Sequence, residues 1–207
     1  NTTNTSIRAL AYQLYENNGV VKRENIKTFL KKISQDERKI LRNLGVKFGR
    51  YHIFLFKLFK PSAVSLRIAL WKNFNQKYFN LKPPTFGLNF LKEKKEYVKD
   101  FMLLCGFEKF DNFFVRIDIL ERLFIQIMNN SKDDKKEIKL IPEMLNLLGC
   151  SKEDFLKLIK NMNYSSFNKN DETYFKYTPI KNNKKQFFPK KHKKENPFSV
   201  LKNINFK

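Results

Sequence analysis

The chain has 207 residues and a formal net charge of +22, with 42 Lys and Arg against 20 Asp and Glu. This length allows one large domain or two small ones, and the charge indicates a polyanionic partner: RNA, DNA or an anionic membrane surface. The lack of a long apolar run excludes a membrane-spanning helix, and two cysteines cannot form a disulfide framework.

The cysteines and the start of the chain bear on its cellular context. Cys105 and Cys150 each lie beside a glycine at a predicted helix end, which is typical of small buried residues in a reducing compartment. The chain begins Asn1-Thr-Thr-Asn, with neither a signal peptide nor an initiator methionine. We therefore expect a cytoplasmic piece of a longer protein, without a membrane partner.

The N-terminal part predicts three short helices, because apolar residues recur at helical spacing. They cover residues 7–16, 22–33 and 34–44. The third begins with Ser34-Gln-Asp-Glu37, a capping box in which the Ser hydroxyl accepts from the Glu37 amide while the Glu side chain bonds back. Three such helices in succession predict a small helical bundle.

Residues 46–60 have no clean period, and Gly45 and Gly49 break the start of this segment, so we expect a buried strand or loop that ends in a short helical turn. Pro61 suits the first turn of a helix over 62–75. The apolar residues near one face of that helix are Val64, Ile68, Trp71 and Phe74. The segment Lys82-Pro-Pro-Thr-Phe-Gly87 is typical of a linker.

The C-terminal half predicts a charged helix over 92–105, an irregular or extended piece over 107–115, and then a regular series of elements from Asp118. The series is a helix, a brief extended segment, two helices joined by a tight turn, and two strands over 164–167 and 173–177. This is the element order of a winged helix, whose third helix can enter a groove of nucleic acid. Here that helix mixes Lys with acidic residues, so a packing or protein-contact role is the alternative.

We therefore predict a mainly α fold: a helical bundle followed by a winged-helix-like α+β subdomain and a basic, disordered tail. The predicted parts are a basic, aromatic-rich helical subdomain (1–81), a linker (82–91), the winged-helix-like subdomain (92–178) and the tail (179–207). The tail holds nine Lys against one acid, which favours phosphate binding over a merely solvated segment. Its candidate phosphate-binding residues are Lys184, Lys185, Lys190, Lys191, Lys193 and Lys194.

Residues 38–92 contain no Asp or Glu but hold twelve Lys and Arg and eleven aromatic residues. The coding bias of an AT-rich genome explains part of the lysine count, but not the missing acids. Uncompensated positive charge suits a polyanion, since each neutralised phosphate releases counterions, and exposed aromatic faces can stack unpaired bases. The candidate nucleic-acid-binding residues here are Arg42, Lys47, Arg50, Tyr51, Lys57, Lys60, Arg67 and Lys72.

No catalytic constellation is present in the sequence. The Gly-rich loop that cradles nucleoside triphosphates is missing, so we expect no nucleotide cofactor. His52 lies in the apolar stretch and is typical of a hydrogen-bonded core residue. Two Cys and two His in four separate contexts do not form a metal site. We expect no catalytic, metal or cofactor site in this chain, which favours a binding module.

Several strings resemble the C-terminal region of bacterial superfamily-two helicases similar to the mitochondrial RNA-degradation helicase. They span most of the chain and are Leu41–Pro61 with Leu66–Trp71, Val115–Leu123, Pro142–Phe155 and Asn196–Leu201. The resemblance implies an ATP-dependent helicase, acting on RNA more than DNA, whose motor domains lie upstream. This chain departs from the family in lacking every motor motif. The resemblance thus implies an accessory region that caps the exit channel or recruits a partner such as a nuclease.

Three hypotheses follow from the sequence. The first is a nucleic-acid-binding accessory region of a helicase that guides single strands by phosphate contacts and base stacking. The second is a protein-interaction or packing module that recruits a nuclease or another partner. The third is a membrane-surface protein, which no sustained basic amphipathic helix supports.

Overall fold

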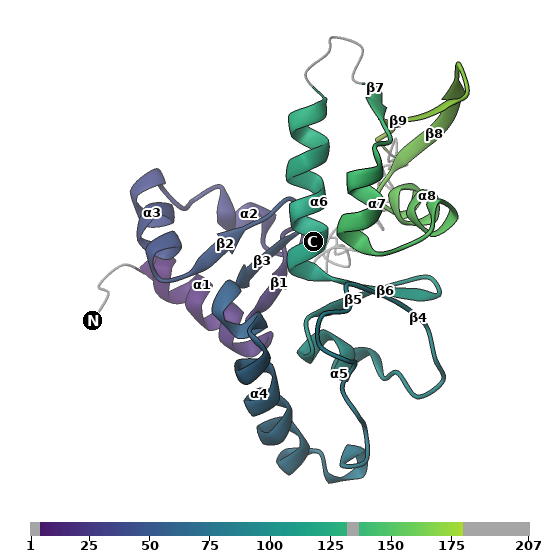
Figure 1. Cartoon of the computed structure of the whole chain (residues 1–207). Helices are drawn as coiled ribbons and strands as arrows, with labels where there is room; N and C mark the ends of the chain where they lie inside the picture. The colour runs from purple at the N-terminus through teal and green to yellow at the C-terminus, as the bar shows by residue number, and fades with distance from the viewer. Residues whose placement is uncertain (1–4, 132–136, 180–207) are drawn as a thin grey trace, which may run out of the picture.

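The computed structural model describes residues 5–131 and 137–179 (Figure 1). About 49% of these residues are helical and 21% lie in strands, which form three small antiparallel sheets. The predicted mainly α fold, a helical bundle followed by a winged-helix-like subdomain, is therefore wrong. The N-terminal part is not a bundle, because three of its segments pair into a sheet.

The described chain consists of three consecutive units. The first contains α1 (Thr5–Glu16), β1 (Val20–Lys22), α2 (Lys27–Leu30), α3 (Gln35–Asn43), β2 (Val46–Phe48) and β3 (His52–Leu55). The 3-10 helix η1 (Phe56–Phe59) leads to the second, which contains α4 (Pro61–Phe74), η2 (Gln76–Tyr78), β4 (Phe90–Lys92), α5 (Lys99–Leu104), β5 (Phe107–Phe110) and β6 (Phe113–Arg116). The third contains α6 (Ile117–Asn130), β7 (Glu137–Lys139), α7 (Pro142–Leu148), α8 (Lys152–Asn161), β8 (Tyr164–Lys169) and β9 (Glu172–Tyr177).

The three units repeat one topology. Each begins with a helix and a short strand, continues with one or two helices and ends with a β-hairpin. In each sheet the last strand of the unit lies in the middle, in the orders β1-β3-β2, β4-β6-β5 and β7-β9-β8. An internal structural repeat of this kind is a signature of units that cover one another's apolar faces.

The turn between the last helix and the hairpin is the same in all three units. One residue there has a left-handed backbone, with φ of 96°, 91° and 65° at Gly45, Gly106 and Asn163. Its carbonyl oxygen accepts a hydrogen bond from the first amide after the hairpin. The three donor–acceptor pairs are Phe56 and Gly45 at 3.2 Å, Ile117 and Gly106 at 2.9 Å, and Thr178 and Asn163 at 2.8 Å.

The helix predicted over 22–33 is confirmed over Lys27–Leu30 alone. Lys22, where it was predicted to begin, is the last residue of β1 and pairs with His52 of β3. Val20 and Val21 precede it in the same strand, which β-branched residues favour. The charged helix predicted over 92–105 is likewise shortened to α5, because β4 pairs with β6.

Other local predictions are confirmed. Ser34 and Glu37 form the capping box at the start of α3, with bonds of 3.2 and 2.6 Å. The predicted order of elements after Asp118 is also present. Ser151 caps α8 by accepting from the amide of Asp154. Phe74 departs from its predicted inward position, since it is 85% exposed while Val64 and Ile68 on the same helix are buried.

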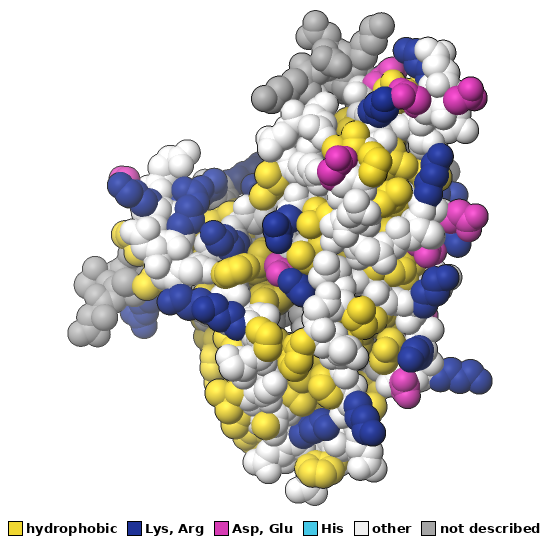
Figure 2. Space-filling model, in the orientation of Figure 1, with side chains coloured by type: hydrophobic (Ala, Val, Ile, Leu, Met, Phe, Trp, Pro, Cys, Tyr) yellow, Lys and Arg dark blue, Asp and Glu magenta, His cyan; other side chains and the backbone are white. Residues whose placement is uncertain are grey.

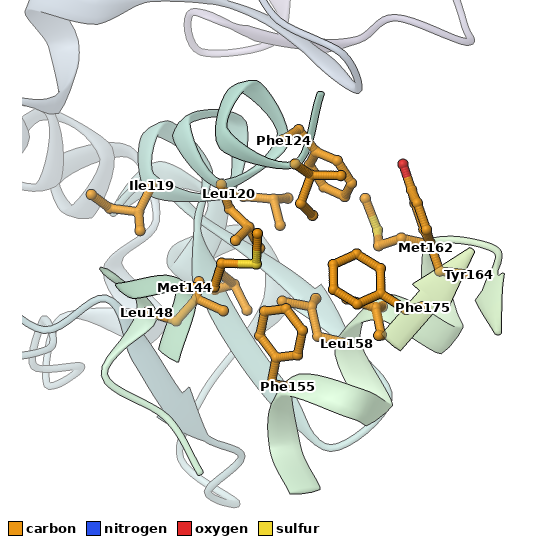
Figure 3. Close-up of a cluster of buried hydrophobic side chains, with 14 of the residues drawn as sticks. Ile119, Leu120, Phe124, Met144, Leu148, Phe155, Leu158, Met162, Tyr164 and Phe175 are labelled. Atoms are coloured by element: carbon orange, nitrogen blue, oxygen red, sulfur yellow. The ribbon is translucent and has the colours of Figure 1, made fainter. Parts of the chain in front are cut away.

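Each sheet carries apolar residues on both faces, and this joins the units. Ile53 of the first sheet faces α1 and α3, whereas Phe54 on the opposite face packs with Ile117 of α6. Phe114 of the second sheet faces the core formed with α4 and α5, whereas Phe113 belongs to the core of the third unit. The core of the third unit lies between α6, α7, α8 and the last sheet (Figure 3).

The turn glycines provide a test of this packing. A Cβ added at Gly106 would lie 2.8 Å from the Phe59 ring, whereas one at Gly149 would meet nothing within 4 Å, although both backbones are left-handed. We expect Gly106→Ala to lower the free energy of unfolding by about 2–5 kcal/mol and the control Gly149→Ala by about 1–2 kcal/mol, measured by urea denaturation. Equal losses would contradict the contact between Gly106 and Phe59.

Candidate nucleic-acid interface

Metal-ligating groups and reactive thiols are the first features to report for the described residues. They contain no group of three or more His, Cys, Asp or Glu side chains placed to hold a metal ion. Burial raises the pKa of the Cys105 thiol to about 12 and that of Cys150 to about 11, so both thiols stay protonated and unreactive at neutral pH.

The hairpin turn of the first unit is fixed by a carboxylate from the third. Glu121 of α6 is 4% exposed, and its two oxygens accept from the consecutive backbone amides of Arg50, Tyr51 and His52. A Cβ on Gly49 would lie 2.3 Å from this carboxylate, so the close approach requires glycine here. Three amides converging on one anion form a nest that neutralises its buried charge.

His52 extends this contact into a buried polar network. Its Nδ1 lies 3.1 Å from Glu121 Oε1, and its Nε2 lies 3.6 Å from Glu108 Oε2 of β5. Glu108 also pairs with Lys22 of β1. Burial disfavours the charged imidazole, but hydrogen bonds and charges from Glu108 and Glu121 outweigh it and raise the pKa of His52. The network thus joins all three units, and His52 is a buried, hydrogen-bonded residue, in agreement with the sequence-based prediction.

Four of the predicted site residues gather where α3, β2 and η1 meet. We call Arg42, Lys47, Lys57 and Lys60 the basic cluster. All four are exposed, and among the described residues no carboxylate lies within ion-pair distance of them. Lys57 runs alongside Gly45, and Lys60 follows in the same 3-10 turn. Half of the predicted residues of this stretch therefore lie on or next to the elements that meet at Gly45.

Aromatic rings lie directly beneath two cations of the basic cluster. The Arg42 guanidinium is 5.7 Å from the centre of the Phe48 ring, and Lys47 Nζ is 5.9 Å from that of Phe56. Phe56 is 45% exposed, so its ring can be reached from solvent. Such cation–π contacts hold a flexible cation in place without neutralising its charge.

Arg50 and Tyr51 lie at the junction with the third unit. The Arg50 guanidinium is exposed, 5.9 Å from the centre of the Tyr177 ring. The Tyr51 ring packs at 4.4 Å from that of Phe124, and its hydroxyl donates to the carbonyl of Met162 at 3.4 Å. Burial is the main reason why the pKa of Tyr51 rises to about 12. Tyr51 therefore anchors the turn, and Arg50 projects from it.

The remaining predicted residues lie apart from the basic cluster. Arg67 is half-buried and donates to the carbonyl oxygens of Leu58 and Asn18, at 3.3 and 2.5 Å, so its guanidinium supports the chain locally. Burial lowers its pKa. Lys72, near the end of α4, sits 5.7 Å from the Phe79 ring centre. The six tail lysines, Lys184 to Lys194, and the tail itself lie outside the described residues.

The structure adds surface residues that the sequence-based selection missed. Arg23 donates to the Gly49 carbonyl at 2.7 Å and lines a hollow of about 330 Å³ with Arg50, Phe48 and α6. On α6, Ile125 and Met128 are 62% and 55% exposed. The sequence contained a signal for these two residues, because at helical spacing they lie outside the inward face formed by Leu120, Leu123, Phe124 and Ile127.

Comparison with protein-family models, curated proteins and solved structures found no match for this chain. Within the described ranges, no helix has both the length and the apolar character required to cross a bilayer. The functional inference therefore depends on the geometry of this chain and on its sequence.

The histidine at the junction predicts a pH dependence of stability. The pKa of folded His52 lies above its ordinary value of 6.5, so its charged form stabilises the fold below about pH 6.5 and this contribution is lost as the pH rises through the raised pKa. We expect the unfolding free energy to fall over that interval in the parent chain, but not in His52→Gln. The control His192→Gln changes the other histidine and should retain the parent's slope. If the unfolding free energy of His52→Gln falls with pH as steeply as that of the parent chain, His52 is not the source of the pH dependence.

Proposed function

We propose that this chain is a nucleic-acid-binding, non-motor accessory region of an ATP-dependent helicase. The observation that carries the proposal is the basic cluster, with four exposed cations that no carboxylate of the described chain neutralises. Such a cluster binds phosphates because condensed counterions are released. Exposed aromatic rings beside it suit single strands, whose bases are free to stack.

The sequence strings that resemble helicases of the RNA-degradation type support the helicase part of the proposal. The first string contains the turn at Gly49 to His52, and the second contains Glu121, so the two meet in one buried contact. On this proposal, RNA is preferred to DNA, the motor domains upstream are the intramolecular partner, and a nuclease is a further candidate partner. Two free cysteines support a reducing, cytoplasmic location.

A second candidate function is protein recruitment, and α4 favours it. Leu66, Leu70 and Phe74 recur every fourth residue and are 62%, 56% and 85% exposed. Figure 2 shows yellow side chains along the lower left edge, where α4 lies in Figure 1. An exposed apolar stripe of this kind suits another protein better than it suits phosphates.

Charge removal at the basic cluster tests the first function. We expect Arg42→Gln, Lys47→Gln, Lys57→Gln and Lys60→Gln together to weaken single-stranded RNA binding and to reduce the slope of log K against log salt by about 3, since each single-strand phosphate contact contributes about 0.7. Fluorescence anisotropy over a salt series measures both.

The matched control removes four exposed lysines of the third unit: Lys152, Lys157, Lys160 and Lys176. It changes the net charge by the same amount but should reduce the slope by less than about 1. Equal effects of the two variants would mean that binding follows net charge alone, and the basic cluster would then not be a site. Arg67 is left intact because it bonds to backbone carbonyls.

A further inference from the structure

Arginine is scarce in this chain and its placement is uneven. There are 34 Lys but only 8 Arg. Four arginines bond within the fold: Arg23 to the Gly49 carbonyl, Arg38 to the Leu30 carbonyl, Arg67 to two carbonyls, and Arg116 to Asp118. Arg23 and three of the remaining four, Arg42, Arg50 and Arg122, gather around the outer side of α6 and the first hairpin.

These four arginines surround a groove with an apolar floor. The first hollow, of about 330 Å³, is lined by Arg23, Arg50, Phe48, Ile125 and Met128 among others. A second, of about 590 Å³, is lined by Arg122 and adjoins the first at Ile125 and Asn129. Arg42 stacks over Phe48 at one end. Figure 2 shows dark blue and yellow side chains around one magenta side chain at the centre, where the first unit meets α6 in Figure 1.

We propose that this groove binds an unpaired nucleobase on Ile125 and Met128, with the flanking phosphates held by Arg23, Arg50 and Arg122. This inference rests on the proposed function and adds a base-contacting site to it. A planar guanidinium offers paired donors that match phosphate oxygens and can also stack on a base. The basic cluster adjoins the groove through Arg42, so a strand can pass from one to the other.

The charges around the groove favour a polyanion with flat apolar groups. Glu121 also lines the first hollow, but its carboxylate is bound to three amides and His52 and is 4% exposed. Glu143 of α7 lines the second hollow, so we confine the base to the first. Two exposed apolar side chains between arginines match a base between phosphates, whereas an acidic peptide would leave them uncovered.

The test is the affinity of the full chain for an oligouridylate and for an abasic oligonucleotide of the same length, by fluorescence anisotropy. We expect Ile125→Ala with Met128→Ala to weaken oligouridylate binding roughly five- to tenfold, with an unchanged salt slope, because stacking but no phosphate contact is lost. Abasic binding should not change. The matched control is Leu66→Ala with Leu70→Ala. These two side chains are 62% and 56% exposed, close to the 62% and 55% of Ile125 and Met128.

The outcomes separate this inference from the proposed function. If the groove variant binds oligouridylate like the parent chain while the basic-cluster variant loses binding, the groove is overturned and the proposed function stands. A parent chain that binds no RNA at physiological salt would overturn both. Equal losses in the groove variant and its control would also overturn the groove. A competition experiment tests the remaining alternative. If poly-glutamate displaces oligouridylate as efficiently as the abasic strand and the free base do together, the groove is assigned to an acidic protein instead.

Discussion

The structure depends on one buried carboxylate. Glu121 projects from α6 into the hairpin turn of the first unit, where three consecutive amides and an imidazole surround it. An unpaired carboxylate in that position would destabilise the fold, since an uncompensated buried charge is costly. Because these hydrogen bonds compensate its charge, the Glu121 carboxylate fixes the turn. The turn then sets the direction in which Arg50 projects and the position in which Tyr51 packs. The relative placement of the first and third units follows from this contact.

The same network explains why the surface of the first unit remains positive. Glu108, Asp118 and Glu121 follow the acid-free stretch closely in space, yet each is already bound: to Lys22, to Arg116 and to the hairpin amides. None is available to the basic cluster. Among the described residues, Lys92 is the one Lys or Arg of residues 38–92 that forms an ion pair, with Asp154, so folding leaves most of this charge unpaired. Uncompensated charge held in a fixed geometry steers a polyanion more effectively than the same charge on a mobile chain.

The sequence predicted much of the local structure and little of the arrangement. Caps at Ser34 and Ser151 and the helices at Pro61 and Pro142 were predicted because their signals are local. The first sheet was missed because β1 has only three residues, and its partner β3 lies some thirty residues away. A three-residue strand has no period of its own, so only tertiary pairing identifies it. The repeat was missed for the same reason, although Leu-Gly-Val-Lys-Phe48 and Cys-Gly-Phe-Glu-Lys-Phe110 share a turn glycine in the same place.

The sequence predicted a basic surface but not which of its side chains bond within the fold. Charge and composition identify the basic stretch. They cannot distinguish Arg67, which donates hydrogen bonds to two backbone carbonyls, from the exposed Lys57. Nor could they join Arg23 to Arg122, which lie far apart in sequence and share a groove only because Glu121 docks α6 on the first hairpin. The repeat then divides the work among similar units. The first helices of the second and third units are both fourteen residues long, but at the sixth position α4 exposes Leu66 whereas α6 exposes Arg122. One topology therefore presents an exposed apolar face in one unit and an exposed face that includes arginine in the next.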